Sequence, residues 1–179
     1  MKEISNNQLR EKAAKIKWFF CDIDGTLTDG GVYYSPEGEL LKRFSLRDGT
    51  GFFLLRQCGI KAGFITTEKS PIVDQRAKKL KIEKYIYGTH RKVEAMQEFL
   101  SSEGLTMENV AFIGDELNDI KLLKAAGLSF AVGDADQRVM EVSDIICEHK
   151  GGNGAFREAV EILLTLSDVD VNHFIDKYL

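Results

Sequence analysis

The stretch WFFCDIDGT, residues 18–26, decides how this chain folds, because an apolar run leads directly into two carboxylates, a glycine and a hydroxyl. Such a run is typical of a strand covered on both faces, as in a parallel sheet, and ligands of open α/β sheets bind beyond the carboxyl ends of such strands. Asp22 and Asp24 are therefore predicted to lie where chemistry takes place, with Gly25 allowing the backbone to turn. Taken alone, the stretch fits an ordinary strand-to-loop turn equally well.

The composition indicates one domain, residues 1–179, that acts on small molecules. The chain is 44% hydrophobic and 29% charged, as expected for a globular domain. Its net charge of −4 argues against a nucleic-acid-binding surface, which needs clustered Lys and Arg. Cys21, Cys58 and Cys147 are widely spaced and odd in number, so we expect reduced thiols in a cytoplasmic protein. No stretch has the form of a leader or a membrane span.

Apolar runs alternate with helical patterns, which predicts a doubly wound parallel α/β sheet. A lead-in helix is expected within residues 1–16. Further strands are expected at 60–66, 85–87, 110–113, 128–132 and 144–147. Helices are expected at 48–58, 70–80, 91–103, around 122–126, 137–142 and 155–166. The tail, residues 168–179, is apolar at helical spacing and is expected to pack back or to contact another subunit.

Residues 31–44 predict a protruding β-hairpin. Two β-rich runs flank Ser-Pro-Glu-Gly, in which Pro36 presets one dihedral angle and Gly38 supplies another. The hairpin carries Val32, Tyr33, Tyr34 and Leu40. Because exposed apolar residues on a strand pair favour association, we expect the hairpin to be buried against another subunit.

Three predicted strand ends and one helix start converge on one edge of the sheet. The polar residues there are Asp22, Asp24, Thr66, Lys92, Asp115, Asn118 and Asp119. Carboxylates from separate strands suit Mg²⁺, which keeps several waters and favours substrate phosphates. Lys92 opposes the helix dipole at the start of its helix, so it favours an anion nearby. Individually, Thr66 is also compatible with an ordinary strand residue and Lys92 with a solvated surface lysine.

This set of groups fits phosphoryl transfer, which depends on positioning and on charge neutralisation. Asp22 would attack phosphorus and form an aspartyl-phosphate. Asp24 would protonate the leaving oxygen and later deprotonate water, while Lys92 would neutralise developing charge.

The motifs that carry these residues resemble those of phosphatases of the haloacid dehalogenase superfamily. Asp-Ile-Asp-Gly-Thr at 22–26 matches the first motif, Thr66 the second, Lys92 the third, and Gly-Asp-Glu-Leu-Asn-Asp at 114–119 the fourth. The resemblance implies a Rossmann-like fold without a cap domain. It also implies that Asp22 is the nucleophile and Asp24 the acid and base.

The resemblance further implies the ligands of the site. Mg²⁺ would be held by Asp22, the backbone carbonyl of Asp24 and Asp115. The phosphate would be held by Thr66, the amide of Thr67 and Lys92, with Asn118 and Asp119 in support.

Two further segments narrow the resemblance to the 3-deoxy-D-manno-octulosonate 8-phosphate phosphatase family. They are Thr-Asp-Gly-Gly at 28–31 and Gly-Gly-Asn-Gly-Ala-Phe-Arg-Glu at 151–158. The chain is similar to that family nearly from end to end. The resemblance implies a homotetramer in which a neighbouring subunit takes the place of a cap and completes each site.

Some positions depart from that family. Thr67 stands where glycine is usual, and Glu116 stands where a second aspartate is common. Glu68, Arg76 and Lys79 resemble the related phosphatases of nine-carbon sugar acids, namely 2-keto-3-deoxynononic acid 9-phosphate and N-acylneuraminate 9-phosphate. Both substrate classes are α-keto acids, whose carboxylate Arg76 and Lys79 could bind, if they are not solvated helix charges.

Two non-enzymatic interpretations remain at this point. A phosphoacceptor receiver domain shares the sheet, an aspartate cluster, a threonine and a lysine, but it has no need of a leaving-group acid such as Asp24. A non-catalytic binding protein on the same fold is the other, and every catalytic position being occupied argues against it. Metal-dependent release of phosphate from a phosphomonoester would identify an enzyme and exclude these two interpretations.

Overall fold

The central strand of the sheet is β1, Trp18–Cys21, in which every residue is buried. The computed structural model describes residues 5–170. The strands beside β1 are β4, Lys61–Ile65, and β6, Val110–Gly114, and both run parallel to it. The full sheet has the order β5-β4-β1-β6-β7-β8 and is completed by β5, Lys84–Ile86, β7, Leu128–Ala131, and β8, Ile145–Ile146. All neighbours pair in parallel, so the predicted doubly wound sheet is confirmed.

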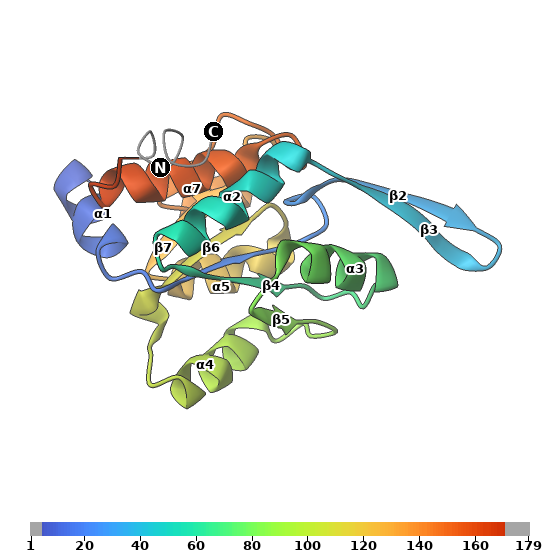
Figure 1. The fold of residues 1–179 in the computed structure, drawn as a ribbon, viewed down its shortest axis with the longest axis horizontal. Helices are drawn as coiled ribbons and strands as arrows, with labels where there is room; N and C mark the ends of the chain where they lie inside the picture. Colours follow the sequence, from blue (N-terminus) through green and yellow to red (C-terminus); the bar gives the residue numbers. More distant parts are fainter. Residues whose placement is uncertain (1–4, 171–179) are drawn as a thin grey trace.

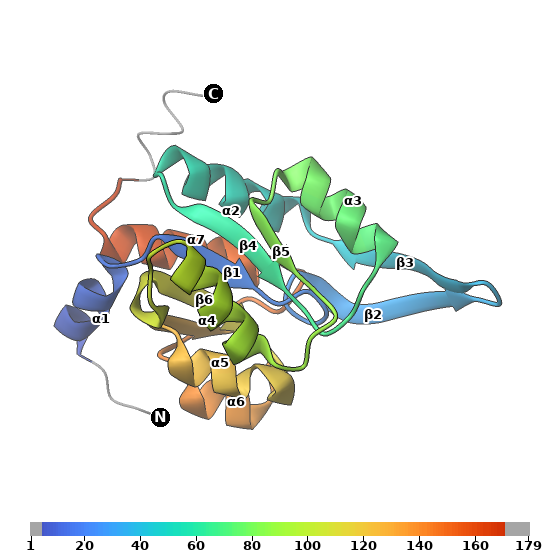
Figure 2. The same ribbon diagram turned by 90° about the horizontal axis from the view of Figure 1, so that it is seen from below.

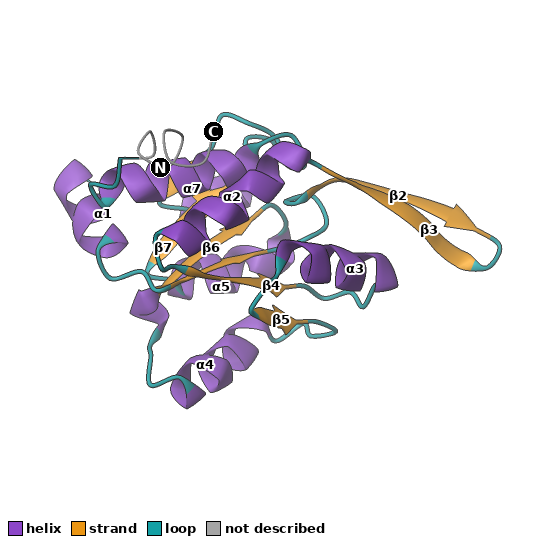
Figure 3. Cartoon of the chain, viewed as in Figure 1, coloured by secondary structure: helices purple, strands orange, loops and turns teal. Residues whose placement is uncertain are grey.

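Helices cover both faces of this sheet (Figures 1 and 3). The first face carries α1, Asn6–Ala13, α2, Leu46–Gln57, α3, Pro71–Leu80, and α7, Ala155–Leu166. The second carries α4, Lys92–Ser102, α5, Ile120–Ala125, and α6, Gln137–Val142. Short 3-10 turns are Met107–Asn109 (η1) and Leu117–Asp119 (η2). Among residues 5–170, no helix combines the length and the apolar character that crossing a bilayer requires.

The element boundaries differ from expectation where local capping decides them. α2 begins at Leu46, earlier than predicted, because the Ser45 hydroxyl accepts from the Arg47 and Asp48 amides. Ser70 is the N-cap residue of α3, but its side chain makes no capping bond and donates to Glu39. The expected packing of residues 171–179 lies outside the described residues.

The hairpin is longer than the sequence pattern indicated. It consists of β2, Thr28–Ser35, and β3, Gly38–Phe44, paired antiparallel. Figure 2 shows it projecting beyond the sheet and helices. Several large apolar side chains near it are exposed, namely Tyr33, Tyr34, Leu40, Leu41 and Leu46.

The core on the first face is built from stacked aromatic rings. Phe19 of β1 contacts Phe130 and Phe156, with ring centroids 5.5 and 5.2 Å apart. Phe52 of α2 stacks on Phe156 of α7 at 4.1 Å. Each such pair stabilises the fold by about 0.5–1.5 kcal/mol beyond its buried area. The three cysteines are free thiols, of which Cys21 and Cys147 are buried.

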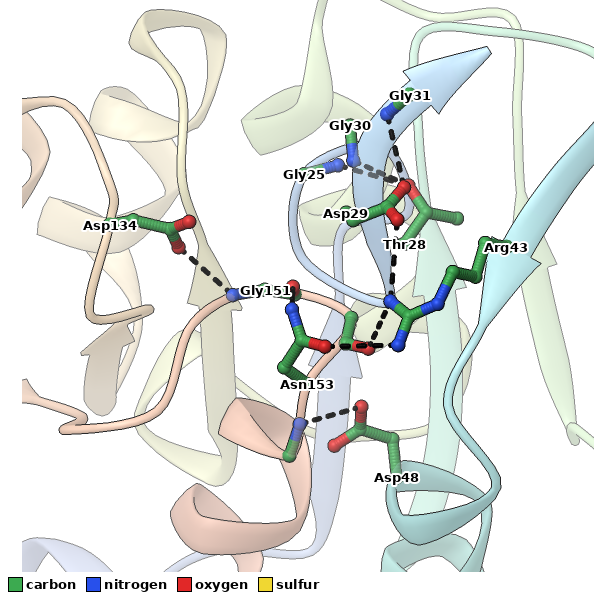
Figure 4. Close-up of polar contacts among 12 residues, drawn as sticks. Gly25, Thr28, Asp29, Gly30, Gly31, Arg43, Asp48, Asp134, Gly151 and Asn153 are labelled. Atoms are coloured by element: carbon green, nitrogen blue, oxygen red, sulfur yellow. Dashed lines mark hydrogen bonds and ion pairs between the residues drawn. The ribbon is translucent and has the colours of Figure 1, made fainter. Parts of the chain in front are cut away.

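Asp48 on α2 caps a different helix, α7. The N-cap residue of α7 is Gly154, which offers no side chain. Oδ2 of Asp48 accepts from the Gly154 amide at 3.2 Å, and Oδ1 accepts from the Arg157 amide at 3.0 Å. Burial raises the pKa of Asp48, although these amides oppose the rise. The side chain of Asp48 thus ties the two aromatic-stacked helices together at their amino ends (Figure 4).

We expect Asp48→Ala to lower the free energy of unfolding by about 1–3 kcal/mol, because two helix-end amides lose a buried acceptor. Urea denaturation measures this change. Asp74→Ala, at an exposed position of α3, is the matched control and should change stability by less than about 0.5 kcal/mol. Equal effects of the two substitutions would contradict the capping role.

Candidate active site

The predicted site residues that follow the strands meet at the carboxyl edge of the sheet. Asp22 follows β1, Thr66 follows β4 and Asp115 follows β6. Lys92 is the first residue of α4. The side chains of Asp22, Thr66 and Lys92 are buried, so Lys92 is not the solvated surface lysine that it resembles in isolation.

Lys92 lies between two aspartates. Its Nζ donates to Oδ1 of Asp22 and to Oδ1 of Asp119, both at 2.6 Å. Burial alone would lower the pKa of Lys92, but the charges of the two aspartates outweigh it and the net shift is upward. Lys92 therefore stays charged. The anion expected beside it is supplied by two carboxylates of the chain itself.

Three carboxylates are close enough to share one cation. Oxygens of Asp22, Asp115 and Asp119 all lie within 4.8 Å of one another. Oδ2 of Asp119 also accepts from the Asp115 amide at 3.2 Å, while its Oδ1 binds Lys92. Because both Asp119 oxygens are engaged, Asp22 and Asp115 are the more available ligands. Asp119 therefore holds Lys92 and the backbone of Asp115.

Burial makes these carboxylates costly in the absence of a cation. Desolvation raises the pKa of Asp22, and the nearby Asp119 raises it further against the effect of Lys92. Desolvation also raises the pKa of Asp115 to about 7, although the Thr26 hydroxyl opposes this. A divalent cation would relieve both penalties, so the donor set fits a hard metal ion such as Mg²⁺.

The turn after Asp24 is shaped to the Asp115 carboxylate. Gly25 has a φ of +91°, and a Cβ there would lie 1.9 Å from Oδ2 of Asp115. The next residue, Thr26, donates from Oγ1 to Oδ1 of Asp115 at 2.8 Å. Thr26 was not among the predicted site residues, although it is part of the motif at 22–26. Its hydroxyl orients a metal-ligand candidate.

The carboxylate of Asp24 contacts Lys42 of the hairpin, whereas that of Asp22 contacts Lys92. Oδ1 of Asp24 accepts from Nζ of Lys42 on β3, which also lies 3.0 Å from Oε1 of Glu39. Burial lowers the pKa of Lys42, but its hydrogen bonds with Asp24 and Glu39 give a net upward shift. Sequence reasoning missed Lys42 and Glu39, because both stand in a hairpin whose pattern predicts exposed charges.

A glycine-rich loop closes against the turn that follows β1 (Figure 4). A Cβ on Gly151 would lie 1.7 Å from the Gly25 carbonyl oxygen. The Gly152 amide donates to the Thr26 carbonyl at 2.9 Å. Arg43 of the hairpin donates to the Gly152 carbonyl at 3.2 Å and to Oδ1 of Asn153 at 3.0 Å. This loop therefore holds the turn after β1 in place.

The remaining predicted residues differ in their exposure and in their contacts. Glu68 and Lys79 are exposed, and the Glu68 amide donates to Oγ1 of Thr66 at 3.2 Å. Arg76 donates to the Ser45 carbonyl at 2.9 Å and lies over the Phe44 ring, so it is not a freely solvated helix charge. Asn118, in η2, is exposed, and Thr67 is half-buried.

Comparison with known proteins defines the family. Residues 75–158 match the sequence profile of haloacid dehalogenase-like hydrolases. The 3-deoxy-D-manno-octulosonate 8-phosphate phosphatase of Haemophilus influenzae is 36% identical over 156 residues, which are 87% of each chain. The chain belongs to the haloacid dehalogenase-like hydrolases. The prediction that it is an enzyme, a phosphoric monoester hydrolase, is thereby confirmed.

Solved structures of related hydrolases agree with this assignment. The 3-deoxy-D-manno-octulosonate 8-phosphate phosphatase from Moraxella catarrhalis, in complex with magnesium, phosphate and KDO, matches with a TM-score of 0.91 at 37% identity. That comparison covers 97% of this chain and 99% of the other. The cobalt-bound enzyme from Haemophilus influenzae matches with a TM-score of 0.84 at 36% identity, covering 88% and 92%.

In the metal-free protein, Asp115 should make stability fall as pH rises from about 4 to about 7. The pKa of this carboxyl is about 7 in the folded protein against a usual 3.8, so in this window the folded state holds a proton that the unfolded state has lost. The slope from this group is at most about 1.4 kcal/mol per pH unit.

Urea denaturation with a chelator present, from pH 4 to pH 8, measures this slope. Asp115→Asn cannot ionise and should lose that part of the pH dependence. A stability difference between wild type and variant that stays constant with pH would refute the assignment.

Proposed function

We propose that this hydrolase is a Mg²⁺-dependent phosphatase that removes the phosphate of 3-deoxy-D-manno-octulosonate 8-phosphate. The observation that carries the proposal is the cluster of Asp22, Asp115, Asp119 and Lys92 at the strand ends. The named activity of relatives at about 36% identity over most of the chain supports the substrate.

In the proposed mechanism Asp22 attacks the phosphate and Asp24 transfers the protons. A carboxylate oxygen of Asp22 attacks phosphorus, and the bond from phosphorus to the sugar oxygen breaks as Asp24 gives that oxygen a proton. Asp24 then takes a proton from the water that attacks the aspartyl-phosphate, which releases phosphate and restores Asp22. Lys92 holds Asp22 in place and balances the charge that develops on the phosphate. Thr66 and the Thr67 amide bind the phosphate, with Asn118 beside them.

A bound Mg²⁺ supplies positive charge that orients the phosphate toward Asp22. Asp22, the Asp24 backbone carbonyl and Asp115 would hold it, and Asp119 would support Asp115 through its amide. The fit rests on three carboxylates that otherwise repel one another in a buried place.

A nine-carbon sugar acid 9-phosphate is the second candidate substrate. Glu68 favours it, because this exposed carboxylate is two residues from Thr66 and is able to bind hydroxyl groups of a longer sugar chain. Arg76 and Lys79 would bind the substrate carboxylate. Of the two, Lys79 is exposed and more accessible, whereas Arg76 is held against the hairpin base.

We further propose a homotetramer located in the cytoplasm, in which a neighbour completes each site. The exposed side chains of Tyr33, Tyr34 and Leu40 support association through the hairpin, since they are 61%, 73% and 60% exposed in the single chain.

Asp22→Asn should lower kcat at least about 10³-fold while the protein still folds, because an amide oxygen is a poor nucleophile toward phosphorus. Phosphate release with Mg²⁺ is measured on octulosonate 8-phosphate, nononic acid 9-phosphate, N-acylneuraminate 9-phosphate and hexose 6-phosphates. Asp74→Asn, exposed on α3, is the matched control. Retained turnover by Asp22→Asn would refute the covalent mechanism, and equal rates on all four would refute sugar-acid specificity.

Glu68→Arg should shift the ratio of kcat/KM between the eight-carbon and nine-carbon phosphates toward the eight-carbon substrate by about tenfold or more. The reason is that the substitution removes an acceptor for the longer chain and adds a donor for a carboxylate. Glu98→Arg, the same charge change at an exposed position of α4, should leave the ratio unchanged. An unaltered ratio in Glu68→Arg would show that this residue does not contact substrate.

A further inference from the structure

The hairpin strand β3 has an inverted pattern of burial. Leu40 and Leu41 are 60% and 44% exposed, whereas Lys42 is 9% exposed and its side chain is 2% exposed. Burying an ammonium group is costly unless it is paired and hydrogen-bonded. A lysine buried in this position needs charged or hydrogen-bonding partners. One partner of Lys42 is Asp24, which belongs to the candidate active site.

Lys42 is one member of a chain of polar side chains. Its Nζ contacts Oδ1 of Asp24 and lies 3.0 Å from Oε1 of Glu39. Oε2 of Glu39 accepts from the hydroxyl of Ser70, the residue before α3. The chain therefore runs from the loop after β1, through the hairpin, to the loop after β4. Its two ends are on the two loops that carry Asp24 and the phosphate-binding residues.

A β-bulge in the hairpin makes this chain possible. Tyr33 pairs with Leu41 but Tyr34 pairs with Glu39, so Leu40 is an extra residue in β3. In a regular strand, side chains three apart point to opposite faces. The extra residue brings Glu39 and Lys42 to the same face, toward Asp24, and turns Leu40 outward.

We propose that Lys42 is a positioning residue that holds the carboxylate of Asp24 where it exchanges protons with the substrate. The proposal rests on the proposed function, in which Asp24 is the acid and base. Asp24 precedes a glycine with positive φ, and its side chain is 27% exposed, so the turn by itself leaves the carboxylate room to move. Lys42 binds Oδ1, and Glu39 with Ser70 fixes Lys42 from behind.

In this proposal Asp24 transfers the protons and Lys42 does not. In the first step the Asp24 hydroxyl gives its proton to the sugar oxygen as that oxygen leaves phosphorus. In the second step Asp24 takes a proton from water as the water oxygen bonds to phosphorus. Lys42 keeps its protons in both steps and contributes orientation, which accounts for large factors in rate when a catalytic group is otherwise mobile.

The test compares leaving groups. p-Nitrophenolate leaves without a proton, whereas a sugar alkoxide needs one, and kcat/KM reports only the steps up to departure of that group. We expect Lys42→Met to lower kcat/KM about tenfold or more for octulosonate 8-phosphate and less than about threefold for p-nitrophenyl phosphate. Asp24→Asn should show the same selective loss. Lys42→Arg, which keeps the positive charge, should lose less activity on octulosonate 8-phosphate than Lys42→Met.

A purely structural role would lower both kcat/KM values by the same factor, and that result would overturn the proposal. Lys15→Met is the matched control, because it also removes a lysine from an ion pair, with Glu108 at 3.1 Å, before the start of β1. It should change neither value. If Lys42→Met does not fold, Ser70→Ala weakens the same chain from its far end and should show a smaller loss of the same selectivity.

A second measurement separates this proposal from the proposed function. Crystal structures of the wild type and of Lys42→Met show the Asp24 side chain without any need for turnover. We expect Asp24 to leave its place beside β3 in the variant, and an unchanged Asp24 would overturn the role of Lys42. A wild type that hydrolyses p-nitrophenyl phosphate but not octulosonate 8-phosphate would refute the proposed substrate alone.

Discussion

The interaction on which the site depends is the buried contact of Lys92 with Asp22 and Asp119. Burial disfavours the charged forms of Lys92 and Asp22, and the attraction between Lys92 and the two aspartates opposes that penalty. The three residues come from the end of β1, the start of α4 and the turn after β6. The sheet order that sets β6 beside β1 thus brings Asp22 and Asp119 to the same lysine, which holds Asp22 in one orientation.

Glycines allow the loops around this contact to approach closely. Gly25 makes room for the Asp115 carboxylate, and Gly151 makes room for the carbonyl of Gly25. The three loops are thereby stacked at separations that no side chain would permit. Arg43 then joins the hairpin to the outermost of them through the Gly152 carbonyl. Close packing of backbone therefore joins these loops in addition to the contacts between charged side chains.

The hairpin has two faces with different uses. Its outer face carries Tyr33 and its strand partner Leu41, which are exposed and suit contact with another subunit. Its inner face carries Glu39 and Lys42, which contact Asp24 and Ser70. The proposed subunit contact and the proposed positioning of Asp24 therefore involve the same short strand.

The sequence by itself determined the order of the elements and the place of the site. Apolar runs such as 18–21 and 110–113 identify buried strands, and carboxylates directly after two such runs must meet when the strands lie parallel and adjacent. The motifs at 22–26 and 114–119, with Thr66 and Lys92, were enough to identify the enzyme class. Each of these signals is local, because it depends on residues that are neighbours in the chain.

Tertiary structure decided what depends on distant residues. Asp48 caps α7 across the space between two helices, and Lys42 is buried between Asp24 and Glu39, which a bulge brings to its face. Neither role leaves a mark in the local pattern, since a lysine in a polar hairpin and an aspartate in a first helical turn are both ordinary. Periodicity encodes which face of an element is apolar, whereas the partner of a buried charge is chosen only when the elements pack.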